Sequence, residues 1–143
     1  MTEHELQILT GAVAEKLIGM LSTDKRFRRV MERAMYISGK QDEIAHYIWC
    51  VMQEVYHVSM AYYDGLGYVI DIIIHMLKYG ENRKDAIKAV AENRGKKESQ
   101  VKYQIKTMLA YTRSQGHNVP NQQKLVEELY EKAVSEFCLG RWV

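Results

Sequence analysis

Apolar residues recur at helical spacing along most of the chain. Near the N-terminus they are Leu6, Leu9, Val13, Leu17, Met20 and Leu21. Positions three and four apart lie on one face of a helix, so this run predicts an amphipathic helix. Thr2 followed by Glu5 has the spacing of a capping box, which stabilises the start of a helix. We therefore predict a first helix over residues 3–21.

Capping residues and glycines divide the rest of the chain into further helices. Ser22 or Thr23 can cap a second helix, which is expected to end near Gly39. The other predicted helices cover residues 40–63, 68–79, 83–94, 97–114 and 121–137. The expected fold is all-α, a multi-helix bundle of about seven helices.

The predicted helix over residues 40–63 carries a heptad-like apolar seam. Its members are Ile44, Ile48, Val51, Val55, Val58 and Tyr62. Such a seam packs either inside a bundle or against a second copy of the chain. We favour the bundle, with a homodimer interface as the alternative. Asp64-Gly65 and Gly67 are expected to break the chain after this helix.

Residues 68–79 are apolar on almost every side, which predicts a central, buried helix. Their high content of β-branched residues makes a buried strand the alternative. The expected break near Asp64 suggests two regions. Residues 1–63 form an N-terminal helical region that braces or dimerises the protein, and residues 64–143 form the domain that carries the function.

Composition favours a cytoplasmic protein that does not span a membrane. Glu3 and Glu5 lie where a secretory signal would need basic residues, and Asp71 and His75 interrupt the most apolar run. Cys50 and Cys138 form no spaced metal or redox motif, so we expect free thiols.

Charge is distributed unevenly along the 143 residues. The net charge is +2 for the whole chain but +6 for residues 83–113, which contain nine Lys and Arg against three Asp and Glu. A basic segment in an otherwise acidic chain is the pattern expected of a polyanion site. A solvated helical face is the alternative.

Within this basic segment the spacing is that of a helix-turn-helix. Ala91 is small enough for two helices to approach closely, Gly95 falls where the turn needs a positive φ, and Val101 falls where the second helix packs on the first. A tight pair of helices without a DNA-binding role shares part of this pattern. The helix over residues 97–114 would be the recognition helix in the major groove of double-stranded DNA.

The outward face of this helix supplies the candidate site. The residues expected nearest the bases are Ser99, Gln100, Tyr103, Lys106 and Thr107. Those expected nearest the phosphates are Lys96, Lys97, Lys102 and Arg113. Two lysines at a helix N-terminus oppose the helix dipole, and a docked phosphate would offset this unfavourable arrangement. An ordinary amphipathic surface helix is the alternative.

The stretch VAENRGKKESQVKYQIKTMLAYTRSQG resembles the C-terminal DNA-binding domain of the sporulation initiation response regulators of Firmicutes. It shares the Val-Ala pair, the Ser-x-Val start of the recognition helix, Ile105 and the closing Ser-Gln-Gly. Gly67-Tyr68 and Pro120-Asn121 extend the likeness over residues 65–138, and it is densest over residues 89–116. The resemblance implies a helix-turn-helix that binds DNA.

The chain departs from this family where DNA specificity is set. Family arginines fall on Gln100, Tyr103 and Lys106, and an acidic position falls on Lys102. The family's target sequence is therefore not carried over. The region before residue 64 lacks the pattern of a phosphoacceptor receiver domain, so we expect no phosphorylation switch of that kind.

Other spacings suggest metal or catalytic chemistry less strongly. Glu43-x-x-His46 and Glu54-x-x-His57 have the spacing of di-iron ligands, but eleven residues of helix hold them about 16 Å apart. His46 and Cys50 lack two further zinc ligands nearby. We expect no metal and no cofactor.

Asp71 and His75, one helical turn apart, suit a structural hydrogen-bonded pair better than a proton-handling pair in a pocket. We expect no catalytic residues and no small-molecule substrate. The leading hypothesis is a DNA-binding transcriptional regulator. The alternative is a helical protein-interaction module that uses the seam over residues 44–62.

Overall fold

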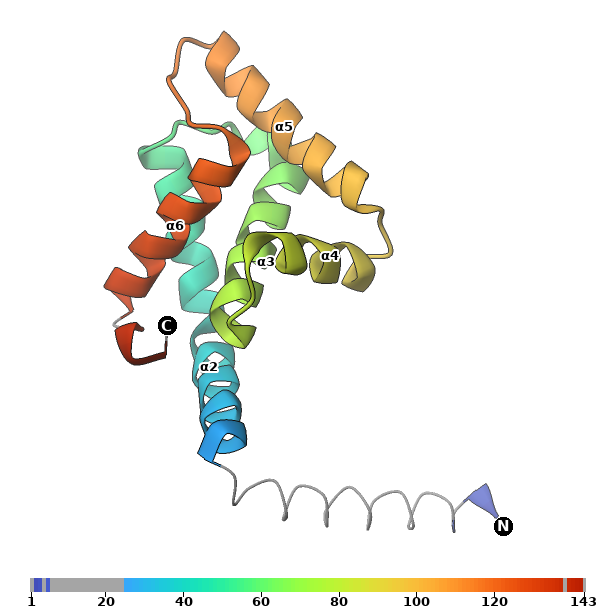
Figure 1. Cartoon of the computed structure of the whole chain (residues 1–143). Coiled ribbons are helices and arrows are strands. Elements are labelled where there is room, and N and C mark those ends of the chain that lie inside the picture. Colours follow the sequence, from blue (N-terminus) through green and yellow to red (C-terminus); the bar gives the residue numbers. More distant parts are fainter. Residues whose placement is uncertain (1, 4, 6–24, 138, 143) are drawn as a thin grey trace.

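The computed structural model describes residues 2, 3, 5, 25–137 and 139–142. In this part of the chain the fold is all-α, as predicted, with five α-helices and no strand. The α-helices are α2 (Lys25–Glu54), α3 (Tyr63–Tyr79), α4 (Arg83–Asn93), α5 (Glu98–Ser114) and α6 (Gln122–Glu136) (Figure 1). There are also two short 3₁₀-helices in the described residues, η1 (Met60–Tyr62) and η2 (Gly140–Trp142).

The N-terminal capping box is confirmed, because the Thr2 amide donates to Glu5 Oε2 (3.0 Å) and the Glu5 amide donates to Thr2 Oγ1 (3.2 Å). Most of the helix predicted over residues 3–21 lies outside the described residues. So does the cap predicted at Ser22 or Thr23.

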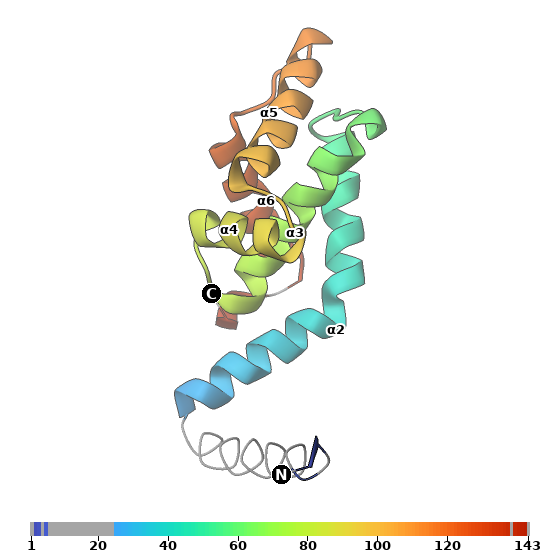
Figure 2. The same ribbon diagram turned by 90° about the vertical axis from the view of Figure 1, so that its right-hand side faces the viewer.

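The predicted second and third helices are a single helix, α2, so the prediction of about seven helices is wrong for the described part. Gly39 lies inside α2, and a Cβ added there would meet nothing within 4 Å. Figure 2 shows that α2 bends about midway along its length. A Ser-Gly pair such as Ser38-Gly39 tolerates a bend without ending the helix. Before the bend, the apolar residues Val30 and Met31 are exposed.

α3 is the central helix and packs against α2, α4, α5 and α6. Ile72, Ile73 and Leu77 are fully buried, which confirms the predicted buried helix and excludes the strand. The predicted break at Asp64-Gly65 and Gly67 is wrong, because α3 begins at Tyr63 and includes all three residues.

The C-terminal end of α3 is closed by a side chain from α2. Gly80 adopts a left-handed conformation (φ +69°) and its amide donates to the Met76 carbonyl. Arg33 Nε donates to the Leu77 carbonyl (2.6 Å) and Arg33 Nη2 to the Met76 carbonyl (3.3 Å). A cation at a helix C-terminus is favoured by the helix dipole. Arg33 therefore fixes the N-terminal half of α2 to the end of α3.

The apolar seam of residues 44–62 packs within the chain. Ile44, Ile48 and Val58 are buried in the core, whereas Val55 is exposed. The core contains residues on both sides of the predicted boundary at residue 64, from Ile37 to Leu139. The bundle interpretation of the seam is the one that this packing supports.

Three predicted helices agree closely with the structure. α4 begins after Asn82, whose Oδ1 accepts from the Asp85 amide (2.9 Å). α6 begins after Asn121, whose Oδ1 accepts from the Lys124 amide (2.9 Å).

Among the helices that the structure describes, none combines the length and apolar character needed to cross a membrane.

Candidate functional site

The α4–α5 turn has the conformation that the sequence predicts. Gly95 has φ +64°, a value that other residues rarely adopt. The Lys96 amide donates to the Ala91 carbonyl (2.9 Å) and the Gly95 amide to the Glu92 carbonyl (3.2 Å). These two bonds form a Schellman motif, which ends α4 and turns the chain into α5. Ala91 and Val101 are buried, as predicted.

Gln100 has a structural role at the start of α5. Lys97 is the N-cap residue, and its side chain offers no acceptor for the free amides of the first turn. Gln100 Oε1 instead accepts from the Lys97 amide (2.9 Å). Gln100 was predicted to contact bases, and its amide oxygen is already engaged in holding the helix start.

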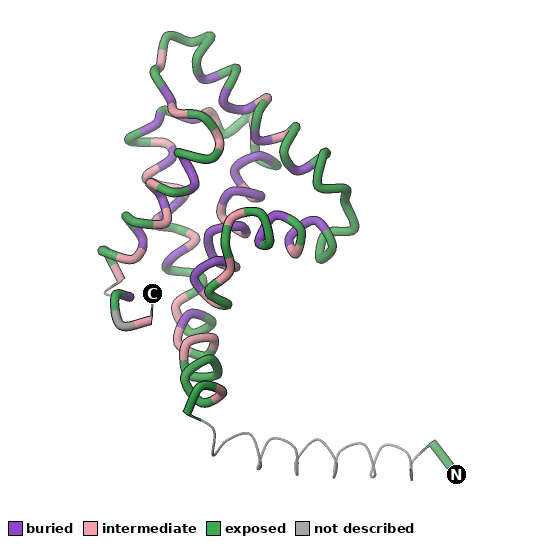
Figure 3. The backbone as a smooth tube through the Cα atoms, viewed as in Figure 1, coloured by how far each residue is buried: buried purple, intermediate pink, exposed green. Residues whose placement is uncertain are grey.

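α5 has one buried face and one exposed face. The buried face consists of Val101, Ile105, Met108, Leu109 and Thr112. Every residue from 92 to 100 is exposed, and so are Lys102, Tyr103 and Lys106. Figure 3 shows the exposed positions along the turn and the outer side of α5. Thr107 is half-buried on the flank of this exposed face.

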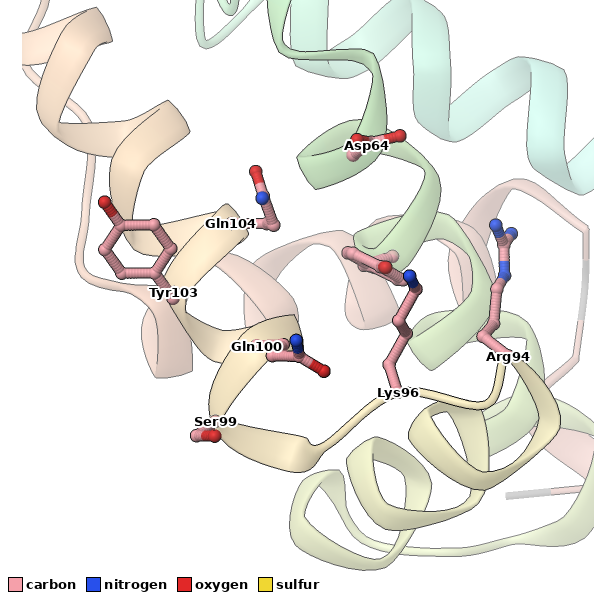
Figure 4. A pocket seen from close by; sticks show the side chains of 8 residues that line it. Asp64, Arg94, Lys96, Ser99, Gln100, Tyr103 and Gln104 are labelled. Atoms are coloured by element: carbon pink, nitrogen blue, oxygen red, sulfur yellow. The ribbon is translucent and has the colours of Figure 1, made fainter.

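Part of the predicted site lines a hollow of about 700 Å³ between α3 and the first turns of α5. Its lining consists of Asp64 and Tyr68 from α3, Arg94 and Lys96 from the turn, and Ser99, Gln100, Tyr103 and Gln104 from α5. In Figure 4, Arg94 and Lys96 extend from the turn toward α3, whereas Ser99 and Tyr103 point away from α3. The structure thus brings four predicted site residues together at this end of α5.

Two of the predicted cations, Lys106 and Arg113, lie farther along α5. Lys106 and Arg113 line a second, smaller depression beside Asn121 and Gln122. Arg113 Nη2 donates to the Pro120 carbonyl (2.9 Å) and Arg113 Nε to the Val119 carbonyl (3.3 Å). Arg113, predicted as a phosphate contact, therefore braces the loop between α5 and α6.

Arg94 is a feature of the site that sequence reasoning missed. Arg94 Nε donates to Asp71 Oδ2 on α3 (2.8 Å), and Arg94 Nη2 donates to the same oxygen. The guanidinium carbon lies 5.5 Å from the centre of the Tyr68 ring, a cation–π arrangement. The predicted Asp71–His75 pair is therefore wrong, because Asp71 pairs with Arg94 across 23 residues of sequence.

His75 approaches a different carboxylate. His75 Nδ1 lies 3.2 Å from Glu81 Oε2, although the two atoms are poorly aligned for a hydrogen bond. A hollow of about 310 Å³ adjoins Asp71, His75 and Arg94. A concave surface does exist where catalysis would need one, but its carboxylate is already neutralised by Arg94.

The candidate metal ligands do not converge in the described part of the chain, where no group of three or more His, Cys, Asp or Glu could hold a metal ion. His46 Nε2, on an exposed residue of α2, lies 3.5 Å from Sγ of the half-buried Cys50. His57 stacks on the His117 ring, with ring centres 4.5 Å apart. Cys138 lies outside the described residues.

Comparison of the chain with protein-family models, with curated protein sequences and with solved structures gives no match. The resemblance to the sporulation regulators therefore stays a prediction, and the function is inferred from the site itself.

Proposed function

We propose that the protein is a DNA-binding transcriptional regulator in which α4 and α5 act as a helix-turn-helix. α5 would enter the major groove of double-stranded DNA. The observation that carries the proposal is the outer face of α5 and its preceding turn, where Lys96, Lys97, Tyr103 and Lys106 are all exposed. Exposed lysines suit phosphate oxygens, and the Ser99 hydroxyl and the Tyr103 ring can reach base edges.

Electrostatics support the same surface. The net charge of +6 in residues 83–113 belongs mostly to exposed side chains of α4, the turn and α5. Lys96 and Lys97 directly precede the first residue of α5, where the helix dipole and the amides of the first turn also attract an anion. One end of α5 therefore combines three sources of positive potential.

The alternative, a protein-interaction module, has less support from the surface that it requires. It requires an exposed apolar stripe along residues 44–62, where Ile44 and Ile48 are fully buried and only Val55 of the seam is exposed. A partner bound through this face would have to displace part of the core. The interaction hypothesis therefore remains only as an outcome of the DNA-binding test.

The test is fluorescence anisotropy with random-sequence duplex DNA at about 50 and about 200 mM salt. We expect binding that weakens steeply with salt, and the double substitution Lys97→Ala/Lys106→Ala should reduce the salt slope by about 0.9 for each phosphate that is no longer neutralised. Lys124→Ala/Lys132→Ala on α6 is the matched control, because it removes the same charge from exposed positions of another helix. Equal reductions in affinity for the two double variants would contradict the α5 surface.

Sequence preference needs variants that leave the helix start intact. Gln100→Ala would remove the hydrogen bond to the Lys97 amide and change α5 itself. Ser99→Ala and Tyr103→Phe change outward groups for which no such bond is formed within the described chain. In a binding-site selection, these two variants should shift the preferred bases while Lys97→Ala lowers affinity for all duplexes alike.

A further inference from the structure

Arg94 is the side chain that ties the α4–α5 turn to the central helix. Its two donors meet one oxygen of Asp71, and its guanidinium lies over the Tyr68 ring. Tyr68 is nearly buried and Asp71 is about one-third exposed, so both are held by the packing of α3. The Arg94 side chain remains half exposed. The guanidinium is therefore fixed in direction and still accessible to a ligand.

The direction of Arg94 matters because a second cation, Lys96, lines the same hollow. Arg94 and Lys96 both line the hollow between α3 and α5, and both extend from the turn toward α3 (Figure 4). Because Arg94 Nε and Nη2 already donate to Asp71, the fork left for two phosphate oxygens consists of Nη1 and the second proton of Nη2. The Lys96 ammonium adds a second charge to the same hollow. The hollow, at about 700 Å³, is larger than one phosphate group requires.

We infer that this hollow is a phosphate site for the DNA backbone, in which Arg94 and Lys96 bind one phosphodiester and Asp71 and Tyr68 act as positioning residues for Arg94. The inference deepens the proposed function and depends on it. It adds Arg94 to the proposed DNA interface, and it means that Asp71 and Tyr68 of α3 set the direction in which Arg94 meets the phosphate. The bound phosphate would fix how far α5 enters the groove.

The inference can be tested at two carboxylates near the hollow, those of Asp64 and Asp71, because their removal should change DNA affinity in opposite directions. Removing an acidic charge beside a DNA surface normally strengthens binding, since it removes repulsion. Asp64, exposed in the first turn of α3, lines the hollow and should follow this rule. Asp71→Asn should instead weaken DNA binding, because it also weakens the ion pair that holds Arg94 in place. The pair Asp71→Asn and Asp64→Asn changes charge equally and separates positioning from repulsion.

The experiment measures duplex affinity and its salt slope for the full chain and four variants. We expect Arg94→Ala to lower affinity about tenfold near 0.1 M salt and to reduce the slope by about 0.9. Arg94→Lys should keep the slope but recover only part of the affinity, because an ammonium cannot form the fork. Asp71→Asn should weaken binding several-fold, and Asp64→Asn should leave it equal or tighter. Circular dichroism checks that each variant keeps its helix content.

The outcomes separate this inference from the proposed function. The inference is overturned if Asp71→Asn binds as tightly as the unmodified protein, or if Arg94→Ala leaves the salt slope unchanged while Lys97→Ala/Lys106→Ala reduces it. In that case α5 still binds DNA and the hollow holds no phosphate. Absence of salt-dependent duplex binding by the unmodified protein overturns both.

Discussion

Gly65 of α3 lies against α5, and this contact can be tested by adding one methyl group. A Cβ at Gly65 would lie 3.0 Å from the Gln104 carbonyl oxygen, 3.0 Å from Met108 Sδ and 3.1 Å from Met108 Cβ. Non-bonded heavy atoms prefer separations of about 3.5–4.0 Å. The methionine side chain can adjust, but a carbonyl inside α5 can move only with the helix. Gly65→Ala should therefore push α5 away from α3.

The expected magnitude is the difference between two opposing effects. Overpacking of this kind costs about 1–3 kcal/mol, whereas alanine is favoured over glycine inside a helix by about 0.5–1 kcal/mol. We therefore expect Gly65→Ala to lower the free energy of unfolding by about 1–2 kcal/mol. Gly67, two residues later in the same helix, is the matched control. Its added Cβ would come no closer than 4.0 Å to Arg94 Nη2, so Gly67→Ala should be stabilising by about 0.5–1 kcal/mol.

Thermal unfolding followed by circular dichroism compares the two variants directly. For a chain of this size, 1 kcal/mol shifts Tm by about 2–4 °C. Gly65→Ala should lower Tm by about 3–6 °C, and Gly67→Ala should raise it by about 2 °C. Shifts of the same sign and size in both variants would refute the close approach of α3 and α5. Agreement would show that the position of α5 is set by its packing on α3 at this glycine.

Other predictions concern contacts that hold the helices in place. Arg33→Ala should lower the free energy of unfolding by about 1–3 kcal/mol, measured by urea unfolding, because it removes two hydrogen bonds at the end of α3. Tyr56→Phe should lower it by about 1–2 kcal/mol through loss of the 2.6 Å bond to Glu128. Burial, and then the bond to Glu128, raises the pKa of Tyr56 above its ordinary value of 10.0, so this contribution is present below pH 10 and is lost as the pH rises further. The phenylalanine variant should therefore lose less stability at alkaline pH than the unmodified protein. Gly95→Ala should be destabilising by about 1–2 kcal/mol because Gly95 has a positive φ. Gly39→Ala, inside α2, should be stabilising by about 0.5–1 kcal/mol. Equal changes in the free energy of unfolding for the two variants would contradict the turn conformation at Gly95.

Glycine explains both the agreement and the errors in the helix boundaries predicted from the sequence. Gly95 ends a helix, and there the apolar pattern stops and resumes in a new phase at Val101. Gly39 and Gly65 were also treated as breaks, yet both lie inside helices. The spacing from Ile37 to Ile44, seven residues, already keeps one helical phase across Gly39. The requirement at Gly65 is different, because it is the approach of α5, and no local pattern encodes that.

In the candidate site too, features set by neighbouring residues could be predicted from the sequence, and features set by contacts between distant residues could not. The outward face of α5 could be predicted because helical periodicity alone decides which residues oppose the buried ones. The roles of Gln100 and Arg94 could not. Gln100 has the spacing to reach the Lys97 amide, but only the structure shows that its amide oxygen accepts that hydrogen bond. The partner of Arg94 lies 23 residues away on α3, so the pairing depends on how α3 and α4 pack. Because Arg94 is bonded to Asp71 on the most buried helix of the bundle, any change that moves α3 should also alter the surface of the turn and α5 for which we propose DNA binding.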